Sequence, residues 1–194
     1  MKKIELKDII PYNDYLKVRK EFQQKIIKLK KNRRVQVGDN ITFVFENRET
    51  VLYQIQEMIR LEKMTDEKLI QQEIDVFNKL IPDENELCAT ILIEIFERQF
   101  IKPILNSLVG IQDNKIFLKF ADESITPIFI DENLPDGRIS AVLYARFKFN
   151  SNQVEKFLNP KNLVTIEINH PNYKAETIIP ENVRLSLMED LRQK

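Results

Sequence analysis

Cysteine and histidine are scarce in this chain of 194 residues, and their scarcity excludes several kinds of metal site. The single cysteine, Cys88, rules out a disulfide within the chain. Together with the single histidine, His170, it falls short of the about four Cys or His ligands that a structural zinc site needs. An iron–sulfur cluster on four cysteines and a ferritin-like di-iron site are excluded for the same reason. Only all-carboxylate sites for hard ions such as magnesium remain open to it. We expect this chain to hold no metal and no cofactor by itself.

Glycine is equally scarce, and a turn or a helix end accounts for each of the three glycines. Gly38 lies in a turn between two apolar runs, Gly110 follows an apolar run of helical spacing, and Gly137 completes the turn sequence Pro135-Asp136-Gly137. A P-loop or a dinucleotide fingerprint requires clustered glycines. The sequence therefore argues against a classical nucleotide-binding enzyme.

Long apolar runs are also missing. None approaches the roughly 18–20 residues of a membrane span, and the N-terminus lacks the apolar stretch of a signal peptide, so we expect a cytoplasmic protein. The composition is 43% hydrophobic and 31% charged, with 30 basic residues balanced by 30 acidic ones. These values are typical of a globular domain, and we expect one domain over residues 1–194 with a soft internal boundary near residue 110.

The periodicity of apolar residues predicts an α+β fold. Helices are expected at 12–32, 47–61, 65–80, 97–109, 153–158 and 181–191, with Asn47 and Thr65 as caps. Strands are expected at 35–37, 41–46, 87–95, 116–120, 126–130, 139–149, 163–168 and 176–179, with Pro127 favouring a sheet edge. Since helices dominate the first half and strands the second, we expect a helical N-terminal half packed on a largely antiparallel sheet from the C-terminal half.

The helix that begins near Asn47 carries the most unusual group of polar residues. Tyr53, Glu57 and Arg60 stand at i, i+4 and i+7 and therefore share one face, while Gln54 lies beside the apolar stripe. With Arg48 at the strand-to-helix junction, they could bind a small polar ligand or a partner's backbone. The alternative is helix capping plus an ion pair between Glu57 and Arg60.

Asn169–Tyr173 is predicted to be a loop that contains His170 and Tyr173. His170 could act as a general base or a pH-sensitive contact, although no nucleophile or orienting carboxylate pair is visible beside it. The alternative is that Tyr173 anchors the loop to the core. Cys88 falls in a predicted buried strand, where an inert small hydrophobe is expected.

Charge is uneven along the chain despite the neutral total. Residues 1–34 contain 12 Lys or Arg and 4 Asp or Glu, a net charge of +8, so the remaining residues carry −8. One interpretation is an electrostatic footprint for nucleic acid over residues 17–34, and its candidate contacts are Lys25, Lys28, Lys31, Arg33 and Arg34. The other is a solvated helix face that pairs with the acidic remainder of the chain.

Several strings resemble a bacterial family of roughly this length that is catalogued only as a domain of unknown function. The resemblance covers nearly the whole chain. It is densest in Tyr12–Tyr15, Arg33–Val35, Phe45–Met58, Ile81–Leu87 and His170–Tyr173, and the string Glu46–Met58 is the specific one. Here Asn169 precedes His170, where the family pattern has an acidic residue, so an Asp–His pair is not available.

The resemblance implies no catalytic residues, but it does imply which proteins are encoded nearby. Genes of the family often lie beside those of rubrerythrin and a cysteine-rich iron–sulfur oxidoreductase. A chain with one cysteine and one histidine is poorly equipped to hold the redox metal itself, so the resemblance implies that it binds the metalloproteins that do.

Three functional hypotheses therefore stand. The first is a non-enzymatic cytoplasmic accessory protein that serves an iron-dependent redox or oxidative-stress system, with a rubrerythrin-like protein or an iron–sulfur oxidoreductase as partner. The second is nucleic-acid binding through residues 17–34. The third is an enzyme that uses Arg48, Glu57 and His170 around a small anionic substrate.

Overall fold

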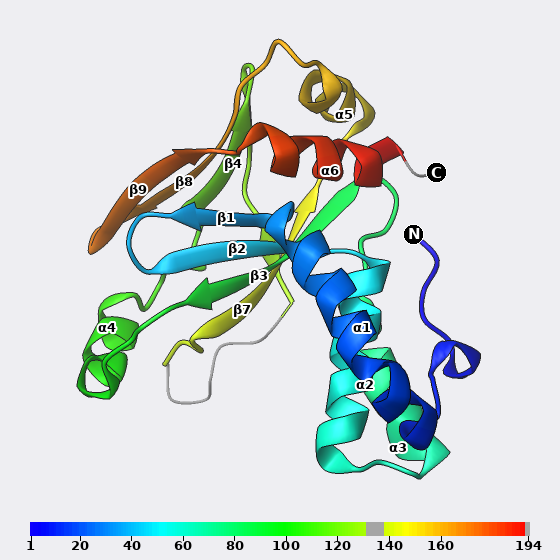
Figure 1. Cartoon of the computed structure of the whole chain (residues 1–194). Coiled ribbons are helices and arrows are strands. Elements are labelled where there is room, and N and C mark those ends of the chain that lie inside the picture. The colour runs from blue at the N-terminus through cyan, green and yellow to red at the C-terminus, as the bar shows by residue number, and fades with distance from the viewer. Residues whose placement is uncertain (131–137, 193–194) are drawn as a thin grey trace.

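The computed structural model describes residues 1–130 and 138–192, and it contains two antiparallel sheets (Figure 1). The first has the order β1-β2-β3-β7-β6 and is built from β1 (Arg34–Val37), β2 (Ile41–Glu46), β3 (Glu86–Ile93), β7 (Val142–Lys148) and β6 (Ile128–Phe129). The second has the order β5-β4-β8-β9 and is built from β5 (Glu123–Ile125), β4 (Ile116–Phe120), β8 (Val164–His170) and β9 (Tyr173–Ile178).

The α-helices of the described residues are α1 (Tyr12–Lys31), α2 (Arg48–Glu62), α3 (Glu67–Phe77), α4 (Ile101–Ser107), α5 (Ser151–Leu158) and α6 (Glu181–Arg192). Short 3₁₀ turns stand at η1 (Leu6–Asp8), η2 (Asn78–Leu80) and η3 (Arg98–Phe100). The α+β class and the antiparallel sheets are confirmed. The first half of the chain nevertheless supplies β1, β2 and β3, so the sheets are not confined to the second half.

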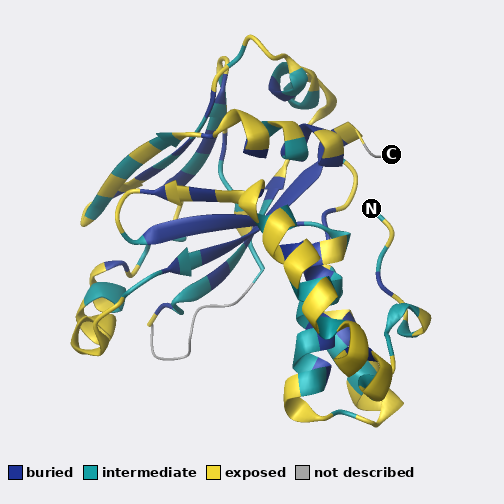
Figure 2. Ribbon diagram, in the orientation of Figure 1, coloured by how far each residue is buried: buried dark blue, intermediate teal, exposed yellow. Residues whose placement is uncertain are grey.

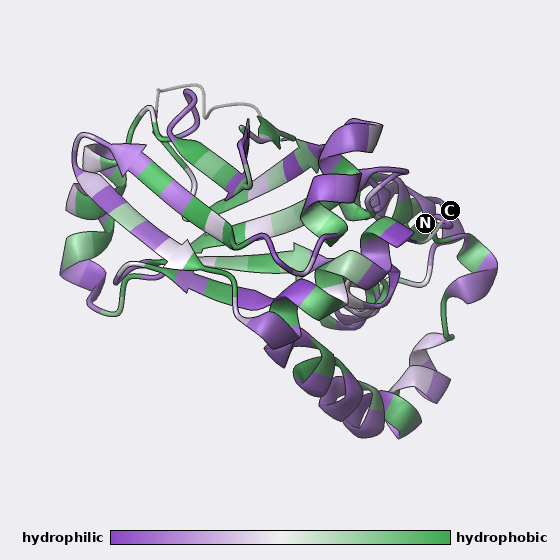
Figure 3. Cartoon of the chain, turned by 90° about the horizontal axis from the view of Figure 1, so that it is seen from above, coloured by the Kyte–Doolittle hydropathy of each residue, from purple (hydrophilic) through white to green (hydrophobic). Residues whose placement is uncertain are grey.

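Two apolar clusters hold these layers together. The larger draws its residues from strands of both sheets. Successive side chains of a strand point to opposite faces, and apolar and polar residues alternate along several of these strands (Figure 3). Phe43 and Phe45 of β2 belong to this cluster together with Leu118 and Ile166 of the second sheet, and Figure 2 shows β2 buried throughout. The smaller cluster joins α2 and α3 to the N-terminal segment through residues such as Ile55 and Ile74. The helices α1 to α3 therefore form a layer of their own beside the sheets (Figure 1).

Capping residues and prolines in the sequence mark the ends of several helices and strands. The Asn47 side chain accepts a hydrogen bond from the Thr50 amide at 3.0 Å, and the Thr50 hydroxyl accepts one from the Asn47 amide at 2.9 Å, so the predicted cap of α2 is confirmed. The cap of α3 was expected at Thr65 but is Asp66, whose carboxylate accepts from the Lys68 amide. The strand predicted at 126–130 is the shorter β6, which begins directly after Pro127 and lies at the edge of its sheet.

The predicted loop Asn169–Tyr173 is wrong. His170 ends β8 and Tyr173 begins β9, and the two residues pair across a two-residue turn of Pro171 and Asn172. Proline presets the backbone of such a turn, so the signal interpreted as a loop belongs to a tight hairpin. The turn predicted at Gly137 lies outside the described residues. No helix within residues 1–130 and 138–192 is long and apolar enough to cross a membrane.

Candidate functional site

The polar face predicted on α2 is turned toward α1. The Glu57 carboxylate accepts two hydrogen bonds from the Arg19 guanidinium, both at 2.8 Å, and one from the Tyr15 hydroxyl at 2.8 Å. Arg60 donates to the same carboxylate at 3.1 Å. These bonds, those from Arg19 first, lower the pKa of Glu57 to about 2. Glu57 is therefore the centre of an interhelical clamp whose acceptor positions are occupied by the protein itself.

Tyr53 and Gln54 stand beside this clamp. The ring of Tyr53 meets Phe22 of α1 edge to face, with centroids 5.8 Å apart, and burial raises the pKa of Tyr53. Gln54 is half-buried, and its side chain makes no hydrogen bond to any residue that the structure describes. The group expected to bind a ligand thus packs α1 against α2.

The N-terminal segment is held by two further residues of α2. Arg48 donates to the Asp8 carboxylate at 2.7 Å. Gln56 is buried, and its side-chain amide bonds both the amide and the carbonyl of Ile10, at 2.8 and 3.0 Å. Gln56 was missed because a polar residue inside an apolar helical stripe gives no signal of its partner.

His170 and Tyr173 both fasten the β8–β9 hairpin to its surroundings. The Nδ1 atom of His170 accepts from the Asn172 amide at 3.2 Å, which leaves Nε2 to donate to the Val109 carbonyl at 3.0 Å. The Tyr173 hydroxyl donates to the Val37 carbonyl at 2.7 Å and accepts from the Asn40 amide at 3.1 Å. Both nitrogens of the buried imidazole are engaged, as is the phenol hydroxyl.

The basic residues of the first helix and its C-terminal flank divide into two groups. One group pairs with acidic residues of the chain, namely Lys17 with Asp14, Arg19 with Glu57, Lys25 with Glu49, Arg33 with Asp190 and Arg34 with Glu94. The other makes no ion pair with any described residue, and it consists of the exposed Lys20, Lys28 and Lys31 and the half-buried Lys30.

The three exposed lysines of the second group, Lys20, Lys28 and Lys31, lie on one outward side of α1, together with Leu16 and Ile27, which are 46% and 53% exposed. Their spacing places all five residues within about 120° of the helix circumference at 100° per residue. We call Leu16, Lys20, Ile27, Lys28 and Lys31 the outer face of α1.

The three residues of the enzyme hypothesis are not brought together. Arg48 pairs with Asp8 at the start of α2, and Glu57 is enclosed by α1. His170 ends β8 and bonds the Val109 carbonyl after α4. In Figure 1 the β8–β9 hairpin and α4 lie on the opposite side of the molecule from α2.

Cys88 does not form a reactive site with its neighbours. The residue is buried in β3, and burial raises the pKa of its thiol to about 11, so it stays protonated at neutral pH. Within residues 1–130 and 138–192, no three His, Cys, Asp or Glu side chains gather in a group that could hold a metal ion.

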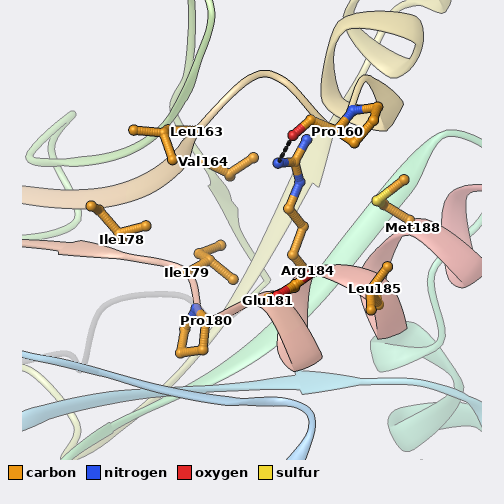
Figure 4. Close-up of a pocket in the computed structure, with 10 residues that line it drawn as sticks. All are labelled: Pro160, Leu163, Val164, Ile178, Ile179, Pro180, Glu181, Arg184, Leu185 and Met188. Carbon is orange, nitrogen blue, oxygen red and sulfur yellow. Dashed lines mark hydrogen bonds between the residues drawn. The ribbon is translucent and has the colours of Figure 1, made fainter.

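A surface groove that the sequence did not reveal lies along α6 (Figure 4). It has a volume of about 360 Å³. Its walls come from α6, from the end of β9 and from the start of β8, and Arg184 of α6 extends across it toward the turn at Pro160. The sequence did hold one sign of this groove. Pro180, Arg184 and Met188 are spaced four residues apart and therefore lie on one side of the helix, where Arg184 is a cation between two apolar residues.

Comparisons with known proteins identify a family but assign no activity. The profile described as "Protein of unknown function (DUF3501)" matches residues 3–191. A crystal structure of a "novel protein of unknown function" from Burkholderia pseudomallei K96243 superposes with a TM-score of 0.91 at 32% sequence identity, covering 98% of this chain and 100% of that chain. A search of the curated proteins found no match.

Proposed function

This chain belongs to the DUF3501 family of proteins of unknown function, and from that premise we propose that it is a non-enzymatic accessory protein of an iron-dependent redox or oxidative-stress system. In this proposal it works in the cytoplasm and binds a protein partner without transforming a substrate. The partner implied by the family resemblance is a rubrerythrin-like protein or an iron–sulfur oxidoreductase.

The engagement of the candidate polar groups supports binding over catalysis. Glu57 accepts from three side chains, Arg48 pairs with Asp8, and both nitrogens of His170 bond the main chain. A general base must be within hydrogen-bond reach of a substrate proton, and here Glu57 and His170 already bond other groups of the chain.

The outer face of α1 is the observation that carries the proposal. Three exposed lysines without acidic partners in the described chain stand beside two exposed apolar side chains. Unpaired charge of one sign steers an oppositely charged partner, and a few apolar contacts supply the burial that keeps it bound. Small, charge-guided interfaces are typical of transient redox encounters. We therefore assign the outer face to an acidic surface on the partner.

Charge reversal on this face tests the proposal. We expect the rubrerythrin-like protein of the same organism to bind the full chain in biolayer interferometry, and we expect Lys20→Glu, Lys28→Glu and Lys31→Glu together to weaken binding at least about tenfold. The matched control reverses Lys68, Lys102 and Lys161, which are exposed lysines outside α1. Equal loss in both triple variants, or no binding of either the rubrerythrin-like protein or the iron–sulfur oxidoreductase, would contradict the proposal.

Nucleic-acid binding through the same face is the second candidate, because Lys28 and Lys31 are exposed and unpaired in the described chain. Arg33 is buried, and Lys25 and Arg34 pair with carboxylates, so three of the five expected contacts are already engaged. Fluorescence anisotropy with labelled duplex DNA and single-stranded RNA distinguishes the two functions. Nucleic-acid affinity that falls steeply with added salt would favour this candidate over a protein partner.

A further inference from the structure

The groove along α6 is a second possible binding surface, separate from the outer face of α1 (Figure 4). Its volume of about 360 Å³ falls at the lower end of the range of small-molecule pockets. Val164, Ile179 and Met188 form a buried floor. The rim is unusually apolar for a surface, since Leu163 and Ile178 are 66% and 55% exposed.

The side chains that line the groove limit the kinds of ligand that it could bind. The side chains that line the groove are aliphatic apart from Glu181 and Arg184, and no aromatic ring is among them. The groove therefore offers no stacking surface for a flat ring, and its apolar walls suit a flexible aliphatic chain.

Arg184 supplies a positive charge inside this apolar groove. Its guanidinium donates to main-chain carbonyls at the end of α5, those of Phe157, Asn159 and Pro160, and Nε is buried without a partner. No carboxylate of the described chain forms an ion pair with it, including Glu181 one turn earlier on α6. Burial without a counter-ion lowers the pKa of Arg184. An anion bound here would supply the missing countercharge.

We propose that this groove binds an unbranched aliphatic carboxylate, such as a medium-chain fatty acid. The alkyl chain lies over the floor between Leu163, Ile178 and Leu185. The carboxylate accepts a hydrogen bond from Nη1 of Arg184, whose bond to the Pro160 carbonyl is long, at 3.4 Å. The ligand thus matches the two features of the groove, an aliphatic lining and a cation without an acidic partner.

Titration calorimetry of the full chain with octanoate and with 1-octanol tests the charge and the apolar surface separately. We expect octanoate to bind at least about tenfold more tightly than 1-octanol, because only the carboxylate meets Arg184. Arg184→Met should reduce octanoate affinity to the level of 1-octanol. Arg192→Met is the matched control, because it removes an exposed arginine from the same helix outside the groove, and it should bind octanoate like the unmodified chain.

A second variant keeps the proposal testable if Arg184→Met fails to fold. Leu163→Asp changes a residue that is already 66% exposed, so the fold should tolerate it. It places a carboxylate on the rim of the groove, which repels the carboxylate of octanoate. We expect the affinity for octanoate to fall at least about tenfold and the affinity for 1-octanol to fall less. Equal affinities for octanoate and 1-octanol, or no binding of octanoate up to about 1 mM, would overturn the proposal.

The same preparation reports whether a second copy of the chain covers the groove instead. If sedimentation equilibrium shows a dimer that Leu163→Asp dissociates and octanoate leaves intact, the groove is a dimer interface and the carboxylate proposal is wrong. Failure of this proposal would leave the function assigned to the outer face of α1 unaffected, because the two surfaces share no residue.

Discussion

Arg33 and Asp190 form a buried ion pair between residues that are 157 positions apart. Their side chains are 1% and 4% exposed. Arg33 follows α1 and donates to the main-chain carbonyls of Phe45 and Glu46 at 2.7 and 3.1 Å, as well as to Ser186 and Asp190 of α6. A single guanidinium therefore joins the end of α1, strand β2 and helix α6.

Replacing Arg33 should be among the most damaging changes in this chain. Arg33→Met leaves Asp190 buried without a partner and should lower the free energy of unfolding by about 3–5 kcal/mol. Urea denaturation measures the loss. Arg34→Met, which removes a half-exposed partner of Glu94, should change stability little. If adding Asp190→Leu to Arg33→Met restores no stability, the isolated carboxylate is not the source of the loss.

Glu57 should make the free energy of unfolding depend on pH. Its pKa is about 2 in the folded chain and about 4.5 when unperturbed, so the unfolded state takes up the proton first as pH falls. The stabilisation is present in full above about pH 4.5 and disappears as pH approaches 2. We expect Glu57 to account for about 2 kcal/mol of the loss, after allowance for solvent screening.

Urea denaturation at pH 6 and pH 3 checks this contribution. Glu57→Gln should be less stable than the unmodified chain at pH 6, and the difference should shrink at pH 3. Glu49→Gln is the control, since Glu49 pairs with Lys25 on the exposed surface. A difference that stays constant between the two pH values would show that the clamp does not act through the charge of Glu57.

The turn at Gly38 should not accept a side chain. Gly38 has a φ of +68°, and a Cβ atom there would stand 2.5 Å from the Tyr173 hydroxyl. Gly38→Ala should therefore lower the free energy of unfolding by about 2 kcal/mol through backbone strain and the clash. Because Tyr173→Phe removes the nearest atom, the double variant should lose less than the sum of the two single losses. Thermal unfolding of the four proteins measures the coupling.

Gln56 should control the order of the N-terminal segment. Gln56→Leu leaves the amide and the carbonyl of Ile10 without partners and should cost about 1–3 kcal/mol. Hydrogen exchange should rise chiefly in residues 1–11, while the sheets stay protected. Gln54→Leu is the matched control, since the side chain of Gln54 makes no hydrogen bond to a described residue. Equal exchange in both variants would contradict this role.

Local sequence signals predicted much of the fold. The Asn47 cap, the hairpin around Gly38 and the edge position at Pro127 follow from residue preferences that act over a few positions. The shared face of Tyr53, Glu57 and Arg60 follows from helix geometry in the same way. The β8–β9 hairpin was missed because a proline-containing turn and a longer loop have the same composition.

The candidate site depended on information that local patterns lack. Lys28 and Arg33 looked alike in the sequence, yet one is exposed and the other is buried against Asp190. Glu57 was paired correctly with Arg60 on its own helix, but Arg19 and Tyr15 come from a different helix.

The sequence by itself determined where most of the helices and strands form, because those preferences depend on nearby residues. Only the tertiary structure decided which charges are neutralised and which stay exposed. Ion pairs such as Arg33–Asp190 and apolar grooves such as that along α6 form between segments far apart in the chain, and strand pairing and helix packing alone bring those segments together.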